Sequence, residues 1–332
     1  MKALVTGANG FLGLYLVEML VARGDRVRTF CRRPSPELDR LGVETVLGDI
    51  REKEAVASAC RGAEVVYHAA AAAGIGGRWQ DYYETNVVGT ENVVEGCSAG
   101  GVGRLVYTSS PSVTFNGVDQ KGVDESTSYA QRWLAPYPRS KAIAEQHVLA
   151  ANGRDGLWTC ALRPHLIFGP RDRHLIPRLL ARARTGRLRR IGDGSNLIDI
   201  VYVENAAHAH LLAADTLGPG SPAAGRAYFI SQGEPVNCWE WVDQILALAH
   251  LPPVGPSISP AAAWWLGAAL ETVYRLFRIP GDPPMTRFLA AQLTTSHYFD
   301  IRGARQDLGY EPRISTADGM QRLASELSLS SF

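Results

Sequence analysis

The first half of the chain alternates short apolar, β-branched runs with longer stretches whose apolar residues recur at helical spacing. After the first run, Leu12, Leu16 and Leu20 fall on one side of a predicted helix. Repeated strand–helix–strand units predict a parallel sheet with helices on both faces. The predicted strands are 3–6, 26–31, 44–47, 65–69, 105–109 and 160–167, and the predicted helices are 11–23, 53–60, 82–99 and 137–150.

Three glycines stand between the first predicted strand and the first predicted helix. Gly7, Gly10 and Gly13 follow a G-x-x-G-x-x-G spacing. Glycines in such a turn let a pyrophosphate approach the backbone, and the helix N-terminus offers free N–H groups to its oxygens. We therefore expect this loop, with Phe11 and Leu12 inside it, to bind a dinucleotide.

The second half of the chain is less regular. Turn clusters separate predicted helices over 175–183, 203–214 and 238–249 and a predicted strand over 228–231. Together with the glycine loop, this pattern predicts an α/β fold with a Rossmann-like, doubly wound parallel sheet. We expect a dinucleotide-binding domain over 1–165 and a smaller substrate-binding lobe over 166–332, interleaved with the first.

The end of the second predicted strand indicates which dinucleotide binds. NAD-binding folds place a carboxylate there for the adenosine ribose, but here Cys31 is followed by Arg32 and Arg33. Two arginines suit the 2′-phosphate of NADP, so we favour NADP(H). NAD(H) stays open, because the same arginines could form an ordinary solvated loop.

Composition excludes several other classes. Of the 332 residues, 46% are hydrophobic and 20% are charged, and the net charge is +1. This balance predicts a sizeable core and argues against a nucleic-acid partner. The five cysteines form no C-x-x-C pair and the eight histidines show no ligand spacing, so we expect no metal site and a cytoplasmic, reducing environment.

The candidate chemistry lies on the helix predicted over 137–150. Only four of the 34 basic residues are lysines, and one of them, Lys141, follows Tyr137 by four positions. Residues i and i+4 share a helix face. An ammonium near a phenol favours the phenolate, so we expect Lys141 to lower the pKa of Tyr137, which exchanges a proton with a substrate oxygen. Lys141 could also hold the nicotinamide ribose.

A third polar partner is expected where the strand predicted over 105–109 ends. Serines cluster there, at Ser109, Ser110 and Ser112, and open parallel sheets bind ligands at the carboxyl ends of their strands. One serine could donate a hydrogen bond to a substrate carbonyl. Serines at strand ends are also common turn formers, so spacing alone does not choose among them.

The ordered set of motifs resembles the extended short-chain dehydrogenases, also called the NAD-dependent epimerase/dehydratase family. These motifs are Thr6-Gly7-x-x-Gly10-x-x-Gly13, His68-Ala69-Ala70, Asn86-x-x-Gly89-Thr90, Tyr107-Thr108-Ser109-Ser110, Tyr137-x-x-x-Lys141 and Arg163-Pro164-x-x-x-Phe168-Gly169-Pro170. The resemblance implies that Ser110 is the catalytic serine beside Tyr137 and Lys141. It also implies cofactor contacts by Asp49 and Ile50 at the adenine, by Ala69, Ala70 and Asn86 along the cofactor, and by Pro164 and His165 near the nicotinamide.

Segments 110–119 and 200–210 resemble one branch of that family, the 3β-hydroxysteroid dehydrogenases. The branch includes sterol-4α-carboxylate 3-dehydrogenases and the bacterial 2-alkyl-3-oxoalkanoate reductases of olefin biosynthesis. The serine segment resembles the latter more. The implied activity interconverts a 3-keto and a 3-hydroxy group on a hydrophobic substrate, in a homodimer. Two alternatives are a nucleotide-sugar epimerase or dehydratase and a non-catalytic dinucleotide sensor.

Two further segments could serve the substrate. Residues 261–278 carry Trp264 and Trp265, and the apolar residues that follow helical spacing there are Leu266, Leu270, Val273 and Phe277. This helix could pack on the lobe, cover an acyl chain, or contact a membrane surface or partner enzyme, which would make the protein peripheral to a membrane. A basic run over 182–190 is either a solvated face or an anion clamp.

Overall fold

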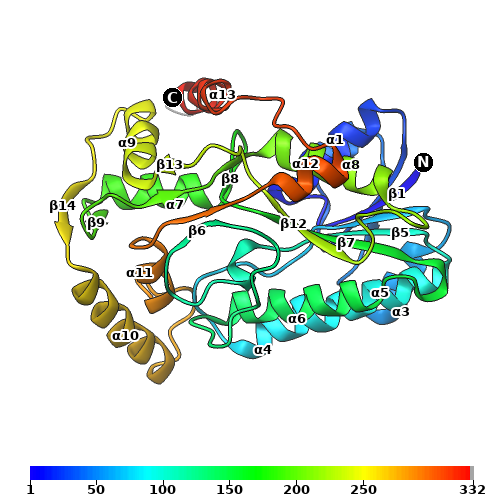
Figure 1. Cartoon of the computed structure of the whole chain (residues 1–332), viewed down its shortest axis with the longest axis horizontal. Coiled ribbons are helices and arrows are strands. Elements are labelled where there is room, and N and C mark those ends of the chain that lie inside the picture. Colours follow the sequence, from blue (N-terminus) through cyan, green and yellow to red (C-terminus); the bar gives the residue numbers. More distant parts are fainter. Residues whose placement is uncertain (330–332) are drawn as a thin grey trace.

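One large parallel sheet organises the molecule. The computed structural model describes residues 1–329, and its main sheet has seven parallel strands in the order β12-β7-β5-β4-β1-β2-β3 (Figure 1). The strands are β1 (Lys2–Thr6), β2 (Arg26–Cys31), β3 (Glu44–Leu47), β4 (Val65–His68), β5 (Arg104–Thr108), β7 (Trp158–Pro164) and β12 (Arg226–Ile230). This doubly wound sheet confirms the predicted Rossmann-like α/β fold.

Helices cover both faces of this sheet. In Figure 1, α3, α5 and α6 lie below the sheet, and α1, α8 and α12 lie above it. Each face buries its own apolar cluster, which explains why the central strands are apolar along their whole length. The elements of this layer are α1 (Phe11–Ala22), α2 (Pro36–Arg40), α3 (Lys53–Cys60), α4 (Trp79–Tyr82), the π-helical turn η1 (Tyr83–Val88), α5 (Gly89–Gly100), the 3₁₀ turns η2 (Pro111–Val113) and η3 (Arg154–Gly156), α6 (Pro136–Ala150), α8 (Val203–Thr216) and α12 (Arg302–Leu308).

A smaller lobe stands at the carboxyl ends of the strands. Its four-stranded sheet has the order β13-β10-β15-β6, and two further strand pairs are β8 with β11 and β9 with β14. The strands are β6 (Gln120–Val123), β8 (Ile167–Phe168), β9 (Arg189–Ile191), β10 (Leu197–Ile198), β11 (Val201–Tyr202), β13 (Val236–Asn237), β14 (Gly255–Ile258) and β15 (His297–Phe299). The helices are α7 (Leu175–Arg184), α9 (Cys238–Leu248), α10 (Pro260–Leu276), α11 (Arg287–Gln292) and α13 (Thr316–Leu329).

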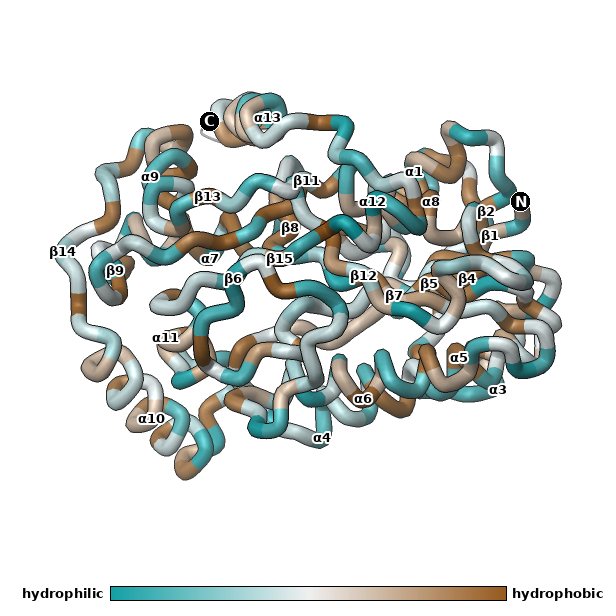
Figure 2. The backbone as a smooth tube through the Cα atoms, in the orientation of Figure 1, coloured by the Kyte–Doolittle hydropathy of each residue, from teal (hydrophilic) through white to brown (hydrophobic). Residues whose placement is uncertain are grey.

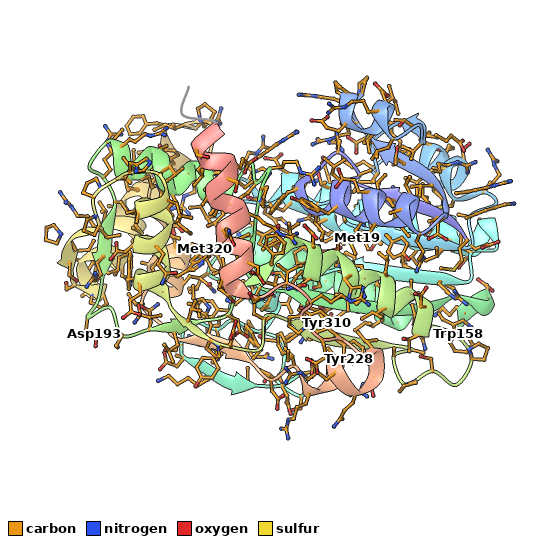
Figure 3. All side chains as sticks on the ribbon, turned by 90° about the horizontal axis from the view of Figure 1, so that it is seen from above. Met19, Trp158, Asp193, Tyr228, Tyr310 and Met320 are labelled. Carbon is orange, nitrogen blue, oxygen red and sulfur yellow. The ribbon has the colours of Figure 1, made fainter. Side chains whose placement is uncertain are left out.

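The chain crosses between the two parts more than once. Strand β6 leaves the first half to join the small sheet, and β12 returns from the second half to the edge of the main sheet. In Figure 3, α13, which carries Met320, crosses the middle of the molecule between the lobe that carries Asp193 and the sheet whose β7 begins at Trp158. A division at residue 165 therefore stays a prediction, and residues 330–332 of the expected lobe lie outside the described residues.

Two predicted elements differ from the observed ones. The helix predicted over 82–99 is interrupted by η1, whose wider turn carries Asn86. The strand predicted over 160–167 ends at Pro164, and the chain turns at Leu166, which has a φ of 39°. The spacing of apolar residues does not predict the interruption of the helix or the early end of the strand, because both depend on contacts with distant loops.

A buried ion pair joins the two central elements that approach the expected site. Arg163 on β7 donates to Glu145 on α6 through Nε at 3.0 Å and through Nη2 at 2.5 Å, and the side chains are only 4% and 0% exposed. Tyr129 donates to the same carboxylate at 2.7 Å. Because both charges are removed from water, each needs the other.

Helix α10 buries one face and exposes the other. Ala263 and Gly267 are buried, and Gly267 lies against the backbone of Thr286 and Arg287. On the opposite face Trp265 is 71% exposed and Leu276 is 73% exposed, and Figure 2 shows apolar residues interleaved with polar ones along this helix. Among residues 1–329, no helix is both long and apolar enough to cross a membrane.

We predict that Glu145→Gln destabilises the fold by about 3–5 kcal/mol, because it leaves the Arg163 guanidinium buried without its counter-charge. Urea denaturation followed by circular dichroism measures this change. Glu95→Gln is the matched control, since its partner Lys53 and Glu95 itself are exposed, and it should leave the unfolding midpoint unchanged. Equal effects of the two substitutions would contradict the prediction.

Candidate active site

The glycine loop is a tight turn that has no room for larger residues. Gly7 has a φ of 69°, and its carbonyl accepts a hydrogen bond from Gly10 N at 2.9 Å. A β-carbon on Gly13 would lie 2.2 Å from Gly7 O, and one on Gly7 would lie 2.7 Å from the backbone of Ala70. These close approaches explain why glycine is needed at both positions.

The N-terminus of α1 fits a phosphate group. Gly10 caps the helix without a side-chain hydrogen bond, and the first turn contains no acidic residue. The amides of Phe11, Leu12 and Gly13 occupy the first three helical positions, where no acceptor exists inside the helix. Backbone donors and the helix dipole therefore point at one place, which is the arrangement a pyrophosphate requires.

Two arginines stand next to this loop. Arg32 and Arg33 follow β2 and are exposed, and Asn9 of the glycine loop donates to the carbonyl of Arg33 at 3.3 Å. Asp49 lies close by. Its pKa is lowered mainly by hydrogen bonding to Arg51, with a smaller contribution from the charge of Arg32. Positive charge thus gathers where the adenosine end of a dinucleotide is expected.

The other residues predicted to contact the cofactor are Ile50, Ala69 and Ala70, and only some of them lie beside the glycine loop. Ile50 is buried, and its carbonyl accepts from Asn92 at 2.9 Å. Ala69 and Ala70 follow β4 directly, and Ala70 N donates to Thr6 Oγ1 at 3.3 Å. This places the backbone of Ala69 and Ala70 against the glycine loop, whereas the Ile50 side chain belongs to the core.

Asn86 connects that backbone to the helix with the candidate catalytic residues. Its amide accepts from Ala72 N at 2.7 Å, and its Nδ2 donates to Ala72 O and to Ser140 Oγ, each at 2.9 Å. Ser140 in turn donates to the carbonyl of Tyr137 at 2.8 Å. The role expected of Asn86, which was support of the backbone near the cofactor, therefore extends to α6.

Tyr137 and Ser110 meet at the mouth of a cavity. Tyr137 is in the first turn of α6, and Ser110 caps the 3₁₀ turn that follows β5. Burial raises the pKa of Tyr137, and a hydrogen bond with Ser110 opposes this effect. Both residues line the cavity, whose volume is about 340 Å³. The structure thus brings Ser110 to Tyr137, whereas the Oγ of Ser109 is buried without a hydrogen-bond partner.

Lys141 is placed differently from the expectation. Its Nζ donates to Thr108 O at 2.5 Å and lies 4.1 Å from the centre of the Tyr107 ring. Burial lowers the pKa of Lys141 to about 7, opposed by the charge of Glu145. The expected lowering of the Tyr137 pKa by Lys141 was wrong for this arrangement, because burial dominates the phenol and the ammonium bonds to a backbone carbonyl.

Thr108 is a site residue that sequence spacing did not single out. Its carbonyl accepts from Lys141, and its Oγ1 lies 2.8 Å from His210 Nε2. His210 Nδ1 lies 2.7 Å from the carbonyl of Ala206. A carbonyl only accepts, so Nδ1 carries the proton and Thr108 donates to Nε2. Burial lowers the pKa of His210 to about 4, which keeps this histidine neutral. Only the tertiary structure could link these residues.

The inner part of the cavity is aromatic. Phe115 contacts Phe288 with ring centres 6.0 Å apart, and Phe299 contacts His165 at 5.4 Å. His165 lies directly after Pro164, and both line the cavity. His165 Nε2 is 2.6 Å from His297 Nδ1. His297 on β15 was also missed, because it is 132 positions away in the chain.

Two features of the sequence concern ions: the spacing of possible metal ligands and the basic run over 182–190. No group of three or more histidine, cysteine or acidic side chains suited to a metal ion is present in the part of the chain that the structure describes. In the basic run, Arg182 donates to Pro284 O at 2.8 Å and Arg190 lies 3.6 Å from Asp243. These two arginines are used within the lobe and do not form an anion clamp at the cavity.

Known proteins of similar sequence identify the family of this chain. A family profile described as the 3-beta hydroxysteroid dehydrogenase/isomerase family matches residues 4–252. A 2-alkyl-3-oxoalkanoate reductase from Stenotrophomonas maltophilia is 49% identical over 326 residues, covering 97% of this chain and 98% of that protein. A sterol-4-alpha-carboxylate 3-dehydrogenase, decarboxylating, from Homo sapiens is 35% identical and covers 97% and 87%.

Solved structures extend the similarity to the fold and the dinucleotide. MoeE5 in complex with UDP-glucose and NAD has a TM-score of 0.76 at 27% identity, covering 99% of each chain. The UDP-glucose 4-epimerase of Thermus thermophilus in complex with NAD has a TM-score of 0.74 at 25% identity, again covering 99% of each chain. The expected resemblance to extended short-chain dehydrogenases is confirmed, and the chain is an oxidoreductase that belongs to the 3-beta hydroxysteroid dehydrogenase/isomerase family.

Proposed function

We propose that this protein is a 2-alkyl-3-oxoalkanoate reductase that interconverts the 3-oxo and 3-hydroxy groups of its substrate. The observation that carries the proposal is that Ser110 and Tyr137 line one cavity with Phe115, Phe288 and Phe299, and that Ser110 acts to lower the pKa of Tyr137 against the effect of burial. The reductase from Stenotrophomonas maltophilia, at 49% identity over almost the whole chain, supports the same substrate class.

The reaction needs one proton at the substrate oxygen. A bound reduced nicotinamide dinucleotide supplies the hydride that reaches C3. Ser110 donates a hydrogen bond that fixes the 3-oxo oxygen, and Tyr137 gives that oxygen its proton as the C–O bond order falls. The raised pKa of Tyr137 keeps the phenol protonated before reaction. In the reverse direction the phenolate oxygen of Tyr137 takes the proton back from the 3-hydroxy group.

Lys141 prepares this proton transfer from one helical turn away. With a pKa near 7, its ammonium gives up or regains a proton at neutral pH. Thr108 holds the amine through its carbonyl, and His210 fixes Thr108. Lys141 thus has a defined position from which to approach the nicotinamide ribose and to replace the proton lost by Tyr137.

The cavity favours an acyl chain over a nucleotide sugar. Phe115, Phe288 and Phe299 line it, and no arginine or lysine does so among the described residues. A diphosphate calls for guanidinium or ammonium donors, while an alkyl chain gains free energy by leaving water for an aromatic wall. The protein therefore fits a hydrophobic keto acid better than the sugar nucleotides bound by its structural relatives.

We favour NADP(H) over NAD(H) as the cofactor. Arg32 and Arg33 support this choice, since both are exposed beside the glycine loop where a 2′-phosphate would lie. The homodimer and a contact between the exposed face of α10 and a membrane surface or partner enzyme stay proposals. The exposed Trp265 and Leu276 on that face support the proposed contact of α10.

We predict that Tyr137→Phe lowers kcat by about 100-fold or more, because the hydroxyl that delivers the proton is lost. Binding of NADPH, followed by fluorescence titration, should be retained. Tyr274→Phe is the matched control, since it removes a phenol on α10 that does not line the cavity. Full activity of Tyr137→Phe would sink the assignment.

We predict that Lys141→Met abolishes turnover and stabilises the fold by on the order of 2–4 kcal/mol at pH 6. Because burial lowers the pKa of Lys141 to about 7, protonation of the buried amine costs the native state most below pH 7. That cost declines as pH rises toward the unfolded value of 10.5, so the gain should shrink by pH 10. Urea titrations across this pH range measure the gain in the free energy of unfolding. Lys2→Met, which removes an exposed lysine, is the control. A gain that stays constant with pH would contradict burial of the ammonium as the cause of the gain.

We predict that replacing Arg32 and Arg33 together by alanine raises the KM for NADPH by about 10- to 100-fold, because two charge-assisted contacts to a phosphate are lost. The KM for NADH should change little. Arg40→Ala, which removes an exposed arginine from the nearby α2, controls for general loss of positive charge. A similar rise for both cofactors would favour NAD(H).

A further inference from the structure

The cavity contains a histidine pair that the proton transfer does not use. His165 is 8% exposed and His297 is 3% exposed, and their ring nitrogens are 2.6 Å apart. His165 lies where the chain leaves β7, beside the strained backbone of Leu166. His297 belongs to β15 of the small sheet, so the pair joins the two parts of the molecule inside the site.

The contact between His297 and the carbonyl of Gln292 fixes which histidine donates the hydrogen bond within the pair. His297 Nε2 is 2.8 Å from the carbonyl of Gln292, which can only accept, so Nε2 carries a proton. In a neutral His297 the other nitrogen, Nδ1, then has a free lone pair. His165 must therefore donate from Nε2 to His297. Within residues 1–329, the remaining nitrogen of His165, Nδ1, has no hydrogen-bond partner, although the residue lines the cavity.

A second polar group without a partner lies nearby. Ser109 Oγ is buried and unpaired, and Ser109 lines the same cavity as His165. Strands β5 and β7 are neighbours with Thr108 opposite Leu162, so Ser109 and His165 leave the sheet from adjacent strands. Buried polar groups without partners cost free energy unless a ligand or solvent satisfies them. The two groups therefore offer unpaired polar atoms to a ligand in a cavity that Phe115, Phe288 and Phe299 also line.

We propose that His165, supported by His297, binds the carboxylate of the substrate, and that the anion enters together with one proton on His165. This inference rests on the proposed function, because a 2-alkyl-3-oxoalkanoate carries its carboxylate two bonds from the carbon that is reduced. A carboxylate only accepts hydrogen bonds. His165 Nδ1 can donate to it only after gaining a proton, which makes His165 an imidazolium.

The surroundings explain why the proton comes with the anion. Burial lowers the pKa of His165, and the neighbouring His297 lowers it further, so the pair is neutral in the free protein. Of the charged and titratable groups around the pair, Asp119 attracts a proton weakly toward His297, and Tyr137 in the cavity is neutral. Asp199 accepts from Phe299 N through one oxygen, its other oxygen is buried without a hydrogen-bond partner, and burial raises its pKa to about 6. A carboxylate inside the cavity supplies the counter-charge that makes a buried imidazolium stable.

Calorimetric titration of the full-length protein with a 2-alkylalkanoate, which lacks the 3-oxygen, tests the subsite without turnover. At pH 8, binding enthalpies in phosphate and in Tris should differ by the uptake of about one proton. His165→Gln should bind at least about tenfold more weakly and take up no proton. His250→Gln makes the same chemical change at an exposed position outside the cavity and should match the unchanged protein. Binding without proton uptake, or equal uptake by His165→Gln, would overturn the proposal.

Turnover gives a second measurement. Oxidation of a 2-alkyl-3-hydroxyalkanoate and of its methyl ester is compared in the unchanged protein and in His165→Gln. The KM for the acid relative to that for the ester should rise about 10- to 100-fold in His165→Gln, since only the acid loses a charge-assisted hydrogen bond. An equal change for both compounds would overturn the carboxylate subsite. If the unchanged protein oxidises neither compound, the proposed function fails, while calorimetry still decides the fate of the subsite.

Discussion

The buried ion pair of Arg163 and Glu145 is the contact on which the geometry of the site depends. Glu145 follows Lys141 by four positions and Tyr137 by eight, so these residues share one face of α6. Arg163 lies on β7, just before the chain enters the cavity wall at His165. A charge pair removed from water tolerates little displacement. It therefore fixes the rotation and height of the helix relative to the sheet edge where the substrate binds.

A continuous line of polar contacts runs through the apolar layers to the same helix. It begins at the end of β1, the strand that leads into the glycine loop, and each hydrogen bond along it satisfies a polar group that is buried away from water. Burial lowers the pKa of its central histidine to about 3, so this residue stays neutral and serves as a structural link. The members in order are Thr6, His68, Thr90, Asn86, Ser140 and Tyr137.

The site combines groups that the fold does not easily tolerate. A buried lysine, a buried histidine pair and an unpaired serine hydroxyl all reduce the stability of the free protein. In the function proposed above, a dinucleotide and an acidic, hydrophobic substrate supply partners for these groups. Active sites commonly accept this cost, and the surrounding apolar clusters, which are far larger, offset it.

Local patterns in the sequence determined most of the main sheet and the candidate catalytic pair. Strand and helix periodicities, the glycine spacing and the Tyr137–Lys141 spacing are local features, so they could be read without tertiary contacts. Only the tertiary structure decided that Lys141 bonds to Thr108, that Ser110 meets Tyr137, and that His165 meets His297 across 132 positions. Burial sets the pKa values and long-range packing sets the hydrogen-bond partners, and neither is encoded in the spacing of residues along the chain.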